Sequence, residues 1–137
     1  DVIQMLNGCI GGLVAITAEP LMPSPLAAIL IGAVGGIIVV YGTKFLLLMK
    51  IDDVVGAIPA HLFAGIWGTL AVPITNSGAS FSTQLLGIVS INASVFAVSF
   101  IIWFLMKSTF GIRLSKDGET KGTDVTETGV IAYAIRD

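Results

Sequence analysis

The chain has 137 residues, of which 55% are hydrophobic and 12% are charged, and its mean hydropathy is +0.95. Because an ordinary soluble domain carries roughly 25% charged residues, this composition excludes a water-soluble globular domain. It also excludes intrinsic disorder, which requires low hydrophobicity and high charge. The net charge of -2 excludes the basic surface that nucleic-acid binding requires. We therefore expect an all-α integral membrane protein.

Four apolar segments are candidates for transmembrane helices, since a spanning helix needs about 20 mostly apolar residues. The first is expected over residues 2–18, and the second and clearest over residues 25–49. The third is expected over residues 53–74 and the fourth over residues 82–110. At about 1.5 Å per residue the fourth helix would be roughly 40 Å long, so it must tilt or extend beyond the bilayer. The polar residues 111–137 are expected to form a water-exposed tail.

Basic residues occur only near the second turn and at or after the end of the fourth helix. They are Lys44, Lys50, Lys107, Arg113, Lys116, Lys121 and Arg136. Four alternating helices place the second turn and the tail on the same side of the membrane. Because cytoplasmic loops carry the excess of Lys and Arg, that side is predicted to be cytoplasmic. We therefore expect a multi-pass protein of the cell membrane with a cytoplasmic carboxyl terminus.

Nothing in the chain indicates catalysis or a bound metal. Cys9 has no second cysteine with which to form a disulfide, and one cysteine and one histidine on different helices lack metal-ligand spacing. No nucleophile, base and acid are arranged as a set, so we predict neither an enzyme nor a cofactor. Because Asp1 is not a start methionine and no basic leader precedes the apolar residues, we expect the chain to begin partway through a longer protein or to have been processed.

Small residues recur at four-residue spacing in the first three predicted helices. They include Gly8, Gly11 and Gly12, then Gly32, Gly35 and Gly36, then Gly56, Ala60, Ala64 and Gly68. Small side chains let helix backbones approach closely within a membrane. The pattern fits general helix packing, and it also fits tightly packed helices that leave a narrow passage.

The third predicted helix contains His61, the only histidine of the chain. It follows Asp53 by eight residues, about 12 Å of helix, which places it inside the hydrocarbon. Ionisable groups at that depth usually face a cavity or a partner. A neutral imidazole has one donor and one acceptor nitrogen for a small polar solute, and Pro59 frees the Val55 carbonyl as a further acceptor. The alternative is a histidine bonded across helices to Ser, Asn or a carbonyl.

Two carboxylates, Asp52 and Asp53, precede this helix, and either can cap its positive end. The whole segment 52–68, DDVVGAIPAHLFAGIWG, resembles the tenth-helix motif of the ammonium transporter (Amt/MEP/Rh) family. Residues 7–18, NGCIGGLVAITA, resemble the eighth helix of that family. In the tail, residues 111–114, 122–126 and 132–133 resemble the start of the family's cytoplasmic tail.

The resemblance implies the carboxy-terminal part, helices eight to eleven, of an eleven-helix inverted-repeat transporter. Family members are trimers in the cytoplasmic membrane, and each subunit has its own narrow hydrophobic pore. His61 matches the second histidine of the family's twin-histidine pair in that pore. In this family, ammonium binds at the outer mouth of the pore, loses its proton and crosses as ammonia, and the resemblance implies the same here. The resemblance also implies a PII-type regulator at the cytoplasmic tail.

Several residues depart from the family pattern. Leu62 replaces the usual glycine beside the pore histidine, and Val54 replaces a proline that usually follows the two aspartates. Thr128 lies where many tails have histidine. Gly122 and Thr126 are candidate regulatory residues of the tail, since Thr126 matches a position that plant relatives phosphorylate to close the pore.

Three functions are therefore compatible with the sequence. The first is transport of ammonium or ammonia, with His61 in the pathway. The second is an ammonium-sensing membrane module that signals through its tail to a partner. The third is an inactive fragment, because four helices alone cannot close a pore that forms between two halves.

Overall fold

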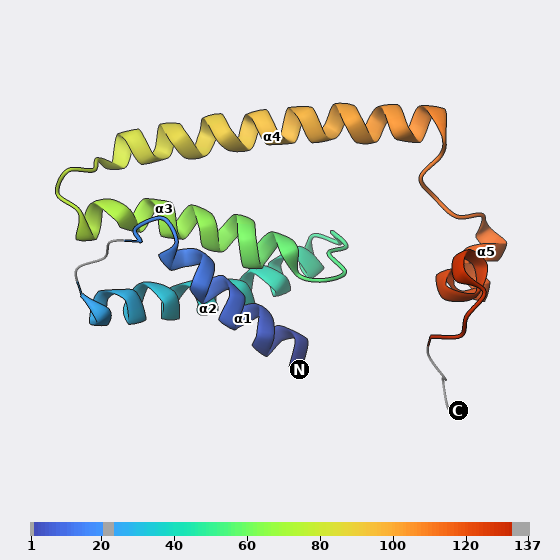
Figure 1. The fold of residues 1–137 in the computed structure, drawn as a ribbon, viewed down its shortest axis with the longest axis horizontal. Helices are drawn as coiled ribbons and strands as arrows, with labels where there is room; N and C mark the ends of the chain where they lie inside the picture. The colour runs from blue at the N-terminus through green and yellow to red at the C-terminus, as the bar shows by residue number, and fades with distance from the viewer. Residues whose placement is uncertain (1, 21–23, 133–137) are drawn as a thin grey trace. The chain divides into compact units, whose positions relative to one another are not determined.

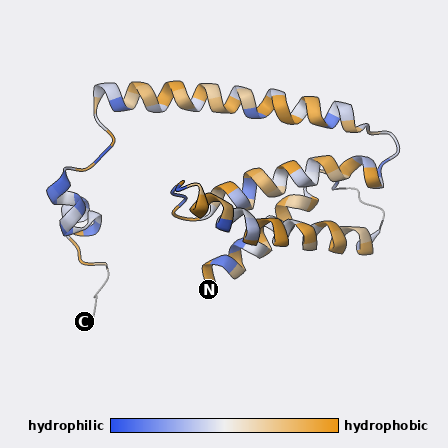
Figure 2. Cartoon of the chain, turned by 180° about the vertical axis from the view of Figure 1, so that it is seen from behind, coloured by the Kyte–Doolittle hydropathy of each residue, from blue (hydrophilic) through white to orange (hydrophobic). Residues whose placement is uncertain are grey.

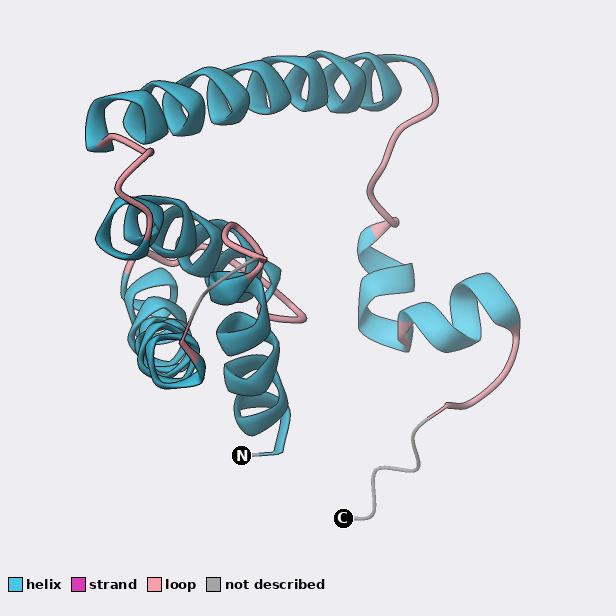
Figure 3. Cartoon of the chain, turned by 60° about the vertical axis from the view of Figure 1, so that its left-hand side comes forward, coloured by secondary structure: helices cyan, strands magenta, loops and turns pink. Residues whose placement is uncertain are grey.

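The computed structural model describes residues 2–20 and 24–132, and every regular element in these ranges is helical (Figures 1 and 3). The elements in chain order are α1 (Val2–Ile16), α2 (Pro25–Leu48), η1 (Ile58–Phe63), α3 (Ala64–Thr75), α4 (Phe81–Thr109), α5 (Lys116–Lys121) and η2 (Asp124–Thr128). The elements η1 and η2 are π-helical. The chain divides into two compact units, Asp1–Asn92 and Ala93–Asp137, and α4 crosses the division.

Three helical segments of the described chain are long and apolar enough to cross a membrane: Pro25–Leu48, Ile58–Thr75 and Phe81–Thr109. The apolar α1 has 15 residues and is shorter than these. Figure 2 shows hydrophobic residues along most of each long helix. These lengths and compositions confirm the expected all-α membrane protein, while the first of the four expected spans is shorter than a membrane-crossing helix requires.

The third predicted helix begins later than expected, at Ile58 instead of residue 53. Gly56 has a φ of +74°, a left-handed conformation that interrupts a right-handed helix. The Asp53 carboxylate accepts hydrogen bonds from the backbone N–H groups of Ala57 and Ile58, at 2.9 and 2.8 Å. Asp53 therefore binds the first N–H groups of the helix from the preceding loop. No hydrogen bond to the Asp52 carboxylate occurs within the described residues.

The helices α1 and α2 pack through facing stripes of glycine. A Cβ added to Gly12 would lie 3.1 Å from the carbonyl oxygen of Gly32, and one added to Gly35 would lie 2.7 Å from that of Gly11. Early residues of α1 thus face late residues of α2, so the two helices run antiparallel. The structure confirms that the stripes serve close helix packing.

The η1–α3 segment packs against both α1 and α2 (Figures 1 and 3). A Cβ at Gly68 would overlap the backbone of Ala15, and Ala15 forms a small buried cluster with Ile31 and Ala71. The indole nitrogen of Trp67 donates a hydrogen bond of 3.0 Å to the Ile31 carbonyl. This bond fixes the position of α3 along α2.

The long helix α4 differs from the packed helices, since none of its 29 residues is buried. Exposed apolar side chains occur all around it, between a few polar residues, and Phe96, Phe100 and Phe104 stack along one face with ring centroids 6.1 and 6.3 Å apart. A helix that is apolar on all sides requires lipid or other protein around it. The hydropathy pattern placed this helix correctly to within one residue at each end.

The tail after α4 is folded by local polar bonds instead of an apolar core. The Ser115 hydroxyl accepts a hydrogen bond from the Gly118 N–H and caps α5. The exposed Arg113 guanidinium and Glu119 carboxylate approach to 2.6 Å. These short elements were not expected from the sequence, which predicts only a polar tail.

Candidate functional site

His61 lies in the middle of η1, where the backbone departs from α-helical geometry. The backbone N–H of Ala64, which follows η1, points to the carbonyl oxygens of both His61 and Pro59. The bond to Pro59 spans five residues, the spacing of a π-helix. One added residue in a turn shifts the side chains that follow around the helix axis, and such segments are frequent at functional sites.

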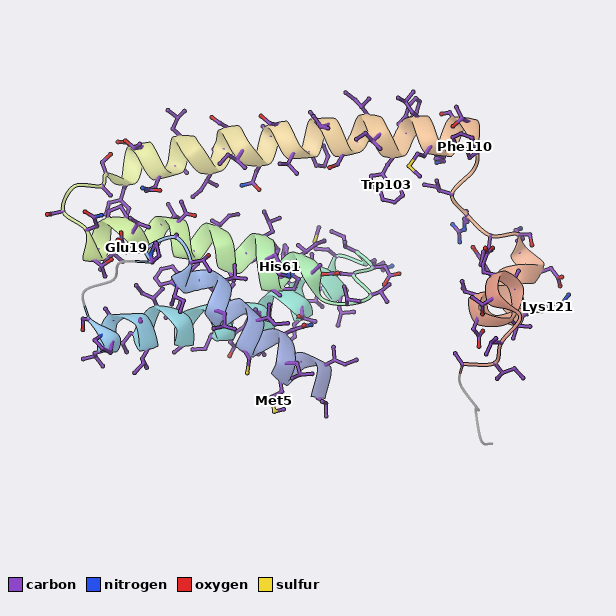
Figure 4. All side chains as sticks on the ribbon, in the orientation of Figure 1. Met5, Glu19, His61, Trp103, Phe110 and Lys121 are labelled. Carbon is purple, nitrogen blue, oxygen red and sulfur yellow. The ribbon has the colours of Figure 1, made fainter. Side chains whose placement is uncertain are left out.

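The His61 side chain is exposed and makes no hydrogen bond to any described residue. Within the described residues, His61 is therefore not hydrogen-bonded across helices to Ser, Asn or a carbonyl. Figure 4 shows the labelled His61 at the η1 end of the segment that continues into α3. The ring is available to a ligand or to groups outside the described chain.

An open cavity of 430 Å³ borders His61 within the Asp1–Asn92 unit. Its polar wall residues include Thr69, Gln84 and Asn92, and the other walls are mostly apolar. The Thr69 hydroxyl and the Asn92 amide donate to carbonyls of their own helices, at 2.9 and 2.8 Å. The cavity therefore has mainly apolar walls with an imidazole that is not already bonded.

The Val55 carbonyl, expected as a further acceptor beside His61, has another role. It lies in the loop before the helix, and it accepts a hydrogen bond of 2.8 Å from the Asn7 side-chain amide of α1. The expectation failed because the helix begins after Gly56, so Val55 does not precede His61 within one continuous helix.

The two departures from the family pattern lie in different surroundings. Leu62 lines the same cavity as His61 and is 39% exposed. Val54 is in the exposed loop before η1, where 84% of its surface is accessible. Leu62 can therefore narrow the space beside the imidazole, whereas Val54 has no contact with that cavity.

The two tail candidates, Gly122 and Thr126, are in contact with each other. The Thr126 hydroxyl donates to the carbonyl oxygens of Gly122, at 2.8 Å, and of Gly118, at 3.2 Å. Gly122 has a φ of +101°, which few other residues adopt. Thr128 donates to the Asp124 carbonyl. Asp1, Tyr133 and Arg136, named above, lie outside the described residues.

Metal-ligating side chains do not gather anywhere in residues 2–20 and 24–132: no group of three His, Cys, Asp or Glu side chains could hold an ion. Cys9 is a free, exposed thiol. The chemistry available at the site is hydrogen bonding by the imidazole.

Comparison with known proteins identifies the family. The model of the Ammonium Transporter Family matches residues 1–133. The chain belongs to the ammonium transporter family. It is 34% identical to the ammonium transporter Amt2 of Archaeoglobus fulgidus, covering 97% of this chain and 33% of that protein. It is 40% identical to the putative ammonium transporter sll1017 of Synechocystis, covering 94% of this chain and 30% of that protein.

A third relative, the ammonium transporter Amt1 of Haloferax mediterranei, is 33% identical over 97% of this chain and 27% of its own length. The chain thus spans about a third of the length of these relatives or less. The matches confirm the family that the segments 7–18 and 52–68 indicated, together with its multi-pass membrane character. The relatives are named as transporters and not as enzymes.

Two residues of the chain have structural roles that the sequence analysis did not predict. Asn7 joins α1 to the loop before η1, and Trp67 joins α3 to α2. Each is a polar group within an apolar segment, which indicates a long-range bond but does not identify the partner.

Proposed function

We propose that this chain is the carboxy-terminal segment of an ammonium transporter, comprising its eighth to eleventh helices and the start of its tail. We further propose that His61 lines the pathway of the transported molecule. The observation that carries this proposal is the exposed, unbonded imidazole on the wall of a mostly apolar cavity. Family membership supplies the substrate class.

The chemistry follows from the difference between ammonium and ammonia. A charged ammonium ion is costly in an apolar passage, whereas neutral ammonia is not. Ammonium therefore gives up its proton before it crosses, and ammonia moves past apolar walls such as Leu62 and Ile66. The His61 ring offers a hydrogen-bond acceptor or donor along the way. Potassium has no proton to lose, so the same passage excludes it.

The assembly and orientation follow the family plan. The proposed state is a trimer in the cytoplasmic membrane, with residues 1–110 in or near the membrane and residues 111–137 as a cytoplasmic tail. Basic residues near the second turn and the tail support this orientation through the positive-inside rule. The folded tail, in which Thr126 bonds to Gly122, would face cytosolic regulators such as a PII-type protein.

Uptake of methylammonium by the full-length protein tests the proposal. His61→Ala is expected to change the rate or the ammonium-to-potassium selectivity when uptake is normalised to the amount of protein in the membrane. Thr75→Ala is a suitable control, because Thr75 lies at the far end of α3 and makes only a long 3.3 Å bond to Val72. Unchanged rate and selectivity in His61→Ala would contradict the assigned role. An absence of uptake by the wild type, with an ammonium-dependent change at the tail, would favour the sensor.

A further inference from the structure

Asn7 connects α1 to the backbone that precedes His61. Its side-chain nitrogen donates a 2.8 Å hydrogen bond to the carbonyl of Val55, 48 residues away in sequence. The bond reaches the chain immediately before Gly56, where the helix containing His61 is about to begin. Asn7 is thus the polar link from α1 to the start of η1.

The absence of a side chain at Gly56 leaves the space that the Asn7 amide occupies. A Cβ on Gly56 would overlap the Asn7 side-chain nitrogen, and the φ of +74° disfavours any side chain there. The Gly56 N–H also donates to the carbonyl of Asp53 at 3.2 Å, closing a tight turn. The amide therefore lies directly against a backbone turn that only glycine accommodates.

The start of η1 needs support from outside the helix. Pro59 lies in the first turn of η1, where the backbone N–H groups have no partner within the helix itself. The Asp53 carboxylate binds the N–H groups of Ala57 and Ile58 from one side. Asn7 binds the Val55 carbonyl and ties the same turn to α1. Together these two side chains fix where the helix begins.

The point at which the helix begins determines the direction of the His61 ring. In an α-helix a shift of one residue rotates a side chain by about 100° around the helix axis, and in the wider turns of the π-helical η1 the angle is somewhat smaller. His61 follows Gly56 by five residues, so the anchored turn and the imidazole are little more than one helical turn apart. A change in the anchor would move the ring relative to its cavity.

We propose that Asn7 is a positioning residue for His61, which sets the direction of the imidazole through its bond to Val55. The inference rests on the proposed transport function. A purely structural role for Asn7 would be the joining of α1 to the bundle. The glycine stripes and the bond from Trp67 already hold α1, α2 and α3 together, so the Asn7 bond is not required for that purpose.

The test compares variants of the full-length protein by the uptake ratio, defined as methylammonium uptake divided by the amount of that variant in the membrane. Asn7→Leu keeps the shape of the side chain and removes its hydrogen-bonding groups. Gln4→Leu is the matched control: Gln4 lies one turn earlier on α1, and its amide makes a longer 3.4 Å bond to Val40 of α2. If Asn7→Leu does not reach the membrane, Asn7→Asp removes the donor and keeps a polar group of the same size.

The expected result is that Asn7→Leu lowers the uptake ratio by about fivefold, the equivalent of one lost hydrogen bond, whereas Gln4→Leu leaves it unchanged. In a His61→Ala background, Asn7→Leu should have no further effect on the ratio. Two results would overturn this inference and leave the proposed function intact. The first is an equal effect of Asn7→Leu with and without His61→Ala. The second is an unchanged ratio in Asn7→Leu when His61→Ala changes it. A wild type without methylammonium uptake would instead contradict the proposed function.

Discussion

The bundle of α1, α2 and α3 and the tail beyond α4 are stabilised by different contacts. In the bundle, glycine backbones touch, and side-chain bonds join residues far apart in sequence, such as Trp67 and Ile31. In the tail, bonds are local and exposed, and both ion pairs found among the described residues lie there. The stability of the bundle therefore depends on side-chain volume, whereas the stability of the tail depends on charge and helix capping.

The largest change in the free energy of unfolding is expected from a glycine substitution in the bundle. Gly35→Ala places a Cβ 2.7 Å from both Ala15 and the Gly11 carbonyl oxygen, so overpacking should lower the free energy of unfolding by about 3 kcal/mol. Gly87→Ala on α4 meets nothing within 4 Å and should raise it by about 0.5–1 kcal/mol through helix propensity. Thermal unfolding in detergent measures both. Shifts of the same sign would contradict the account of the bundle.

Removal of the long-range bond from Trp67 should have the next largest effect. Trp67→Phe leaves the Ile31 carbonyl without its 3.0 Å donor, and we expect a loss of about 1–2 kcal/mol. Trp103→Phe is the control, since Trp103 on α4 is 58% exposed and has no described hydrogen bond. Denaturant unfolding monitored by circular dichroism separates the two variants. Equal losses would show that the bond to Ile31 is not what distinguishes Trp67.

Substitution of the two aspartates before η1 should have smaller effects on stability, and the two effects should differ. Asp53→Ala removes the acceptor of two backbone N–H groups and should destabilise the helix by about 1 kcal/mol. Asp52→Ala should have little effect, because no described group bonds to that carboxylate. Hydrogen exchange at Ala57 and Ile58 reports the difference directly. Faster exchange in Asp52→Ala than in Asp53→Ala would reverse the assignment.

The smallest effect on the stability of the whole protein is expected from a change in pH, which should alter the structure of the tail. Hydrogen bonding to Arg113 lowers the pKa of Glu119, and the N–H groups of Ala132 and Val125 lower the pKa of Asp124. A carboxyl with a depressed folded pKa stabilises the fold above its unfolded pKa of about 4, and this contribution is lost as the pH falls through the folded pKa.

We therefore expect the tail structure to be unchanged between about pH 6 and 8 and to loosen below about pH 4, while the bundle stays folded. Amide resonances of Gly118 and Gly122 in NMR spectra of the full-length protein follow the tail, and those of Gly35 and Gly68 follow the bundle. Simultaneous loss of both sets would show that the bundle also depends on titrating groups.

The sequence predicted those features that depend on local pattern. The long apolar runs and Pro25 located α2 and α4 to within one residue at each end, because hydropathy and proline act locally. The glycine stripes predicted close packing, and the alternation of the spans already implied that α1 runs antiparallel to α2. The start of the third helix was missed because it depends on the left-handed Gly56 and on Asp53 acting from the preceding loop.

The candidate site was predicted only in part. His61 could be identified because a single ionisable residue within an apolar segment is uncommon. Its surroundings could not be predicted, since the cavity requires residues from a later helix, such as Gln84 and Asn92. The bond of Asn7 to Val55 was also out of reach, because spacing along the chain contains no information on a contact between residues 48 positions apart.

An experimental structure of the full-length protein, at a resolution that orients the His61 imidazole, tests the central claim most directly. The account predicts that the edge of the ring borders a continuous narrow passage through the subunit, with the Asn7 amide still bonded to the Val55 carbonyl. A ring that faces lipid, or one enclosed in a sealed contact with no passage beside it, would contradict the account.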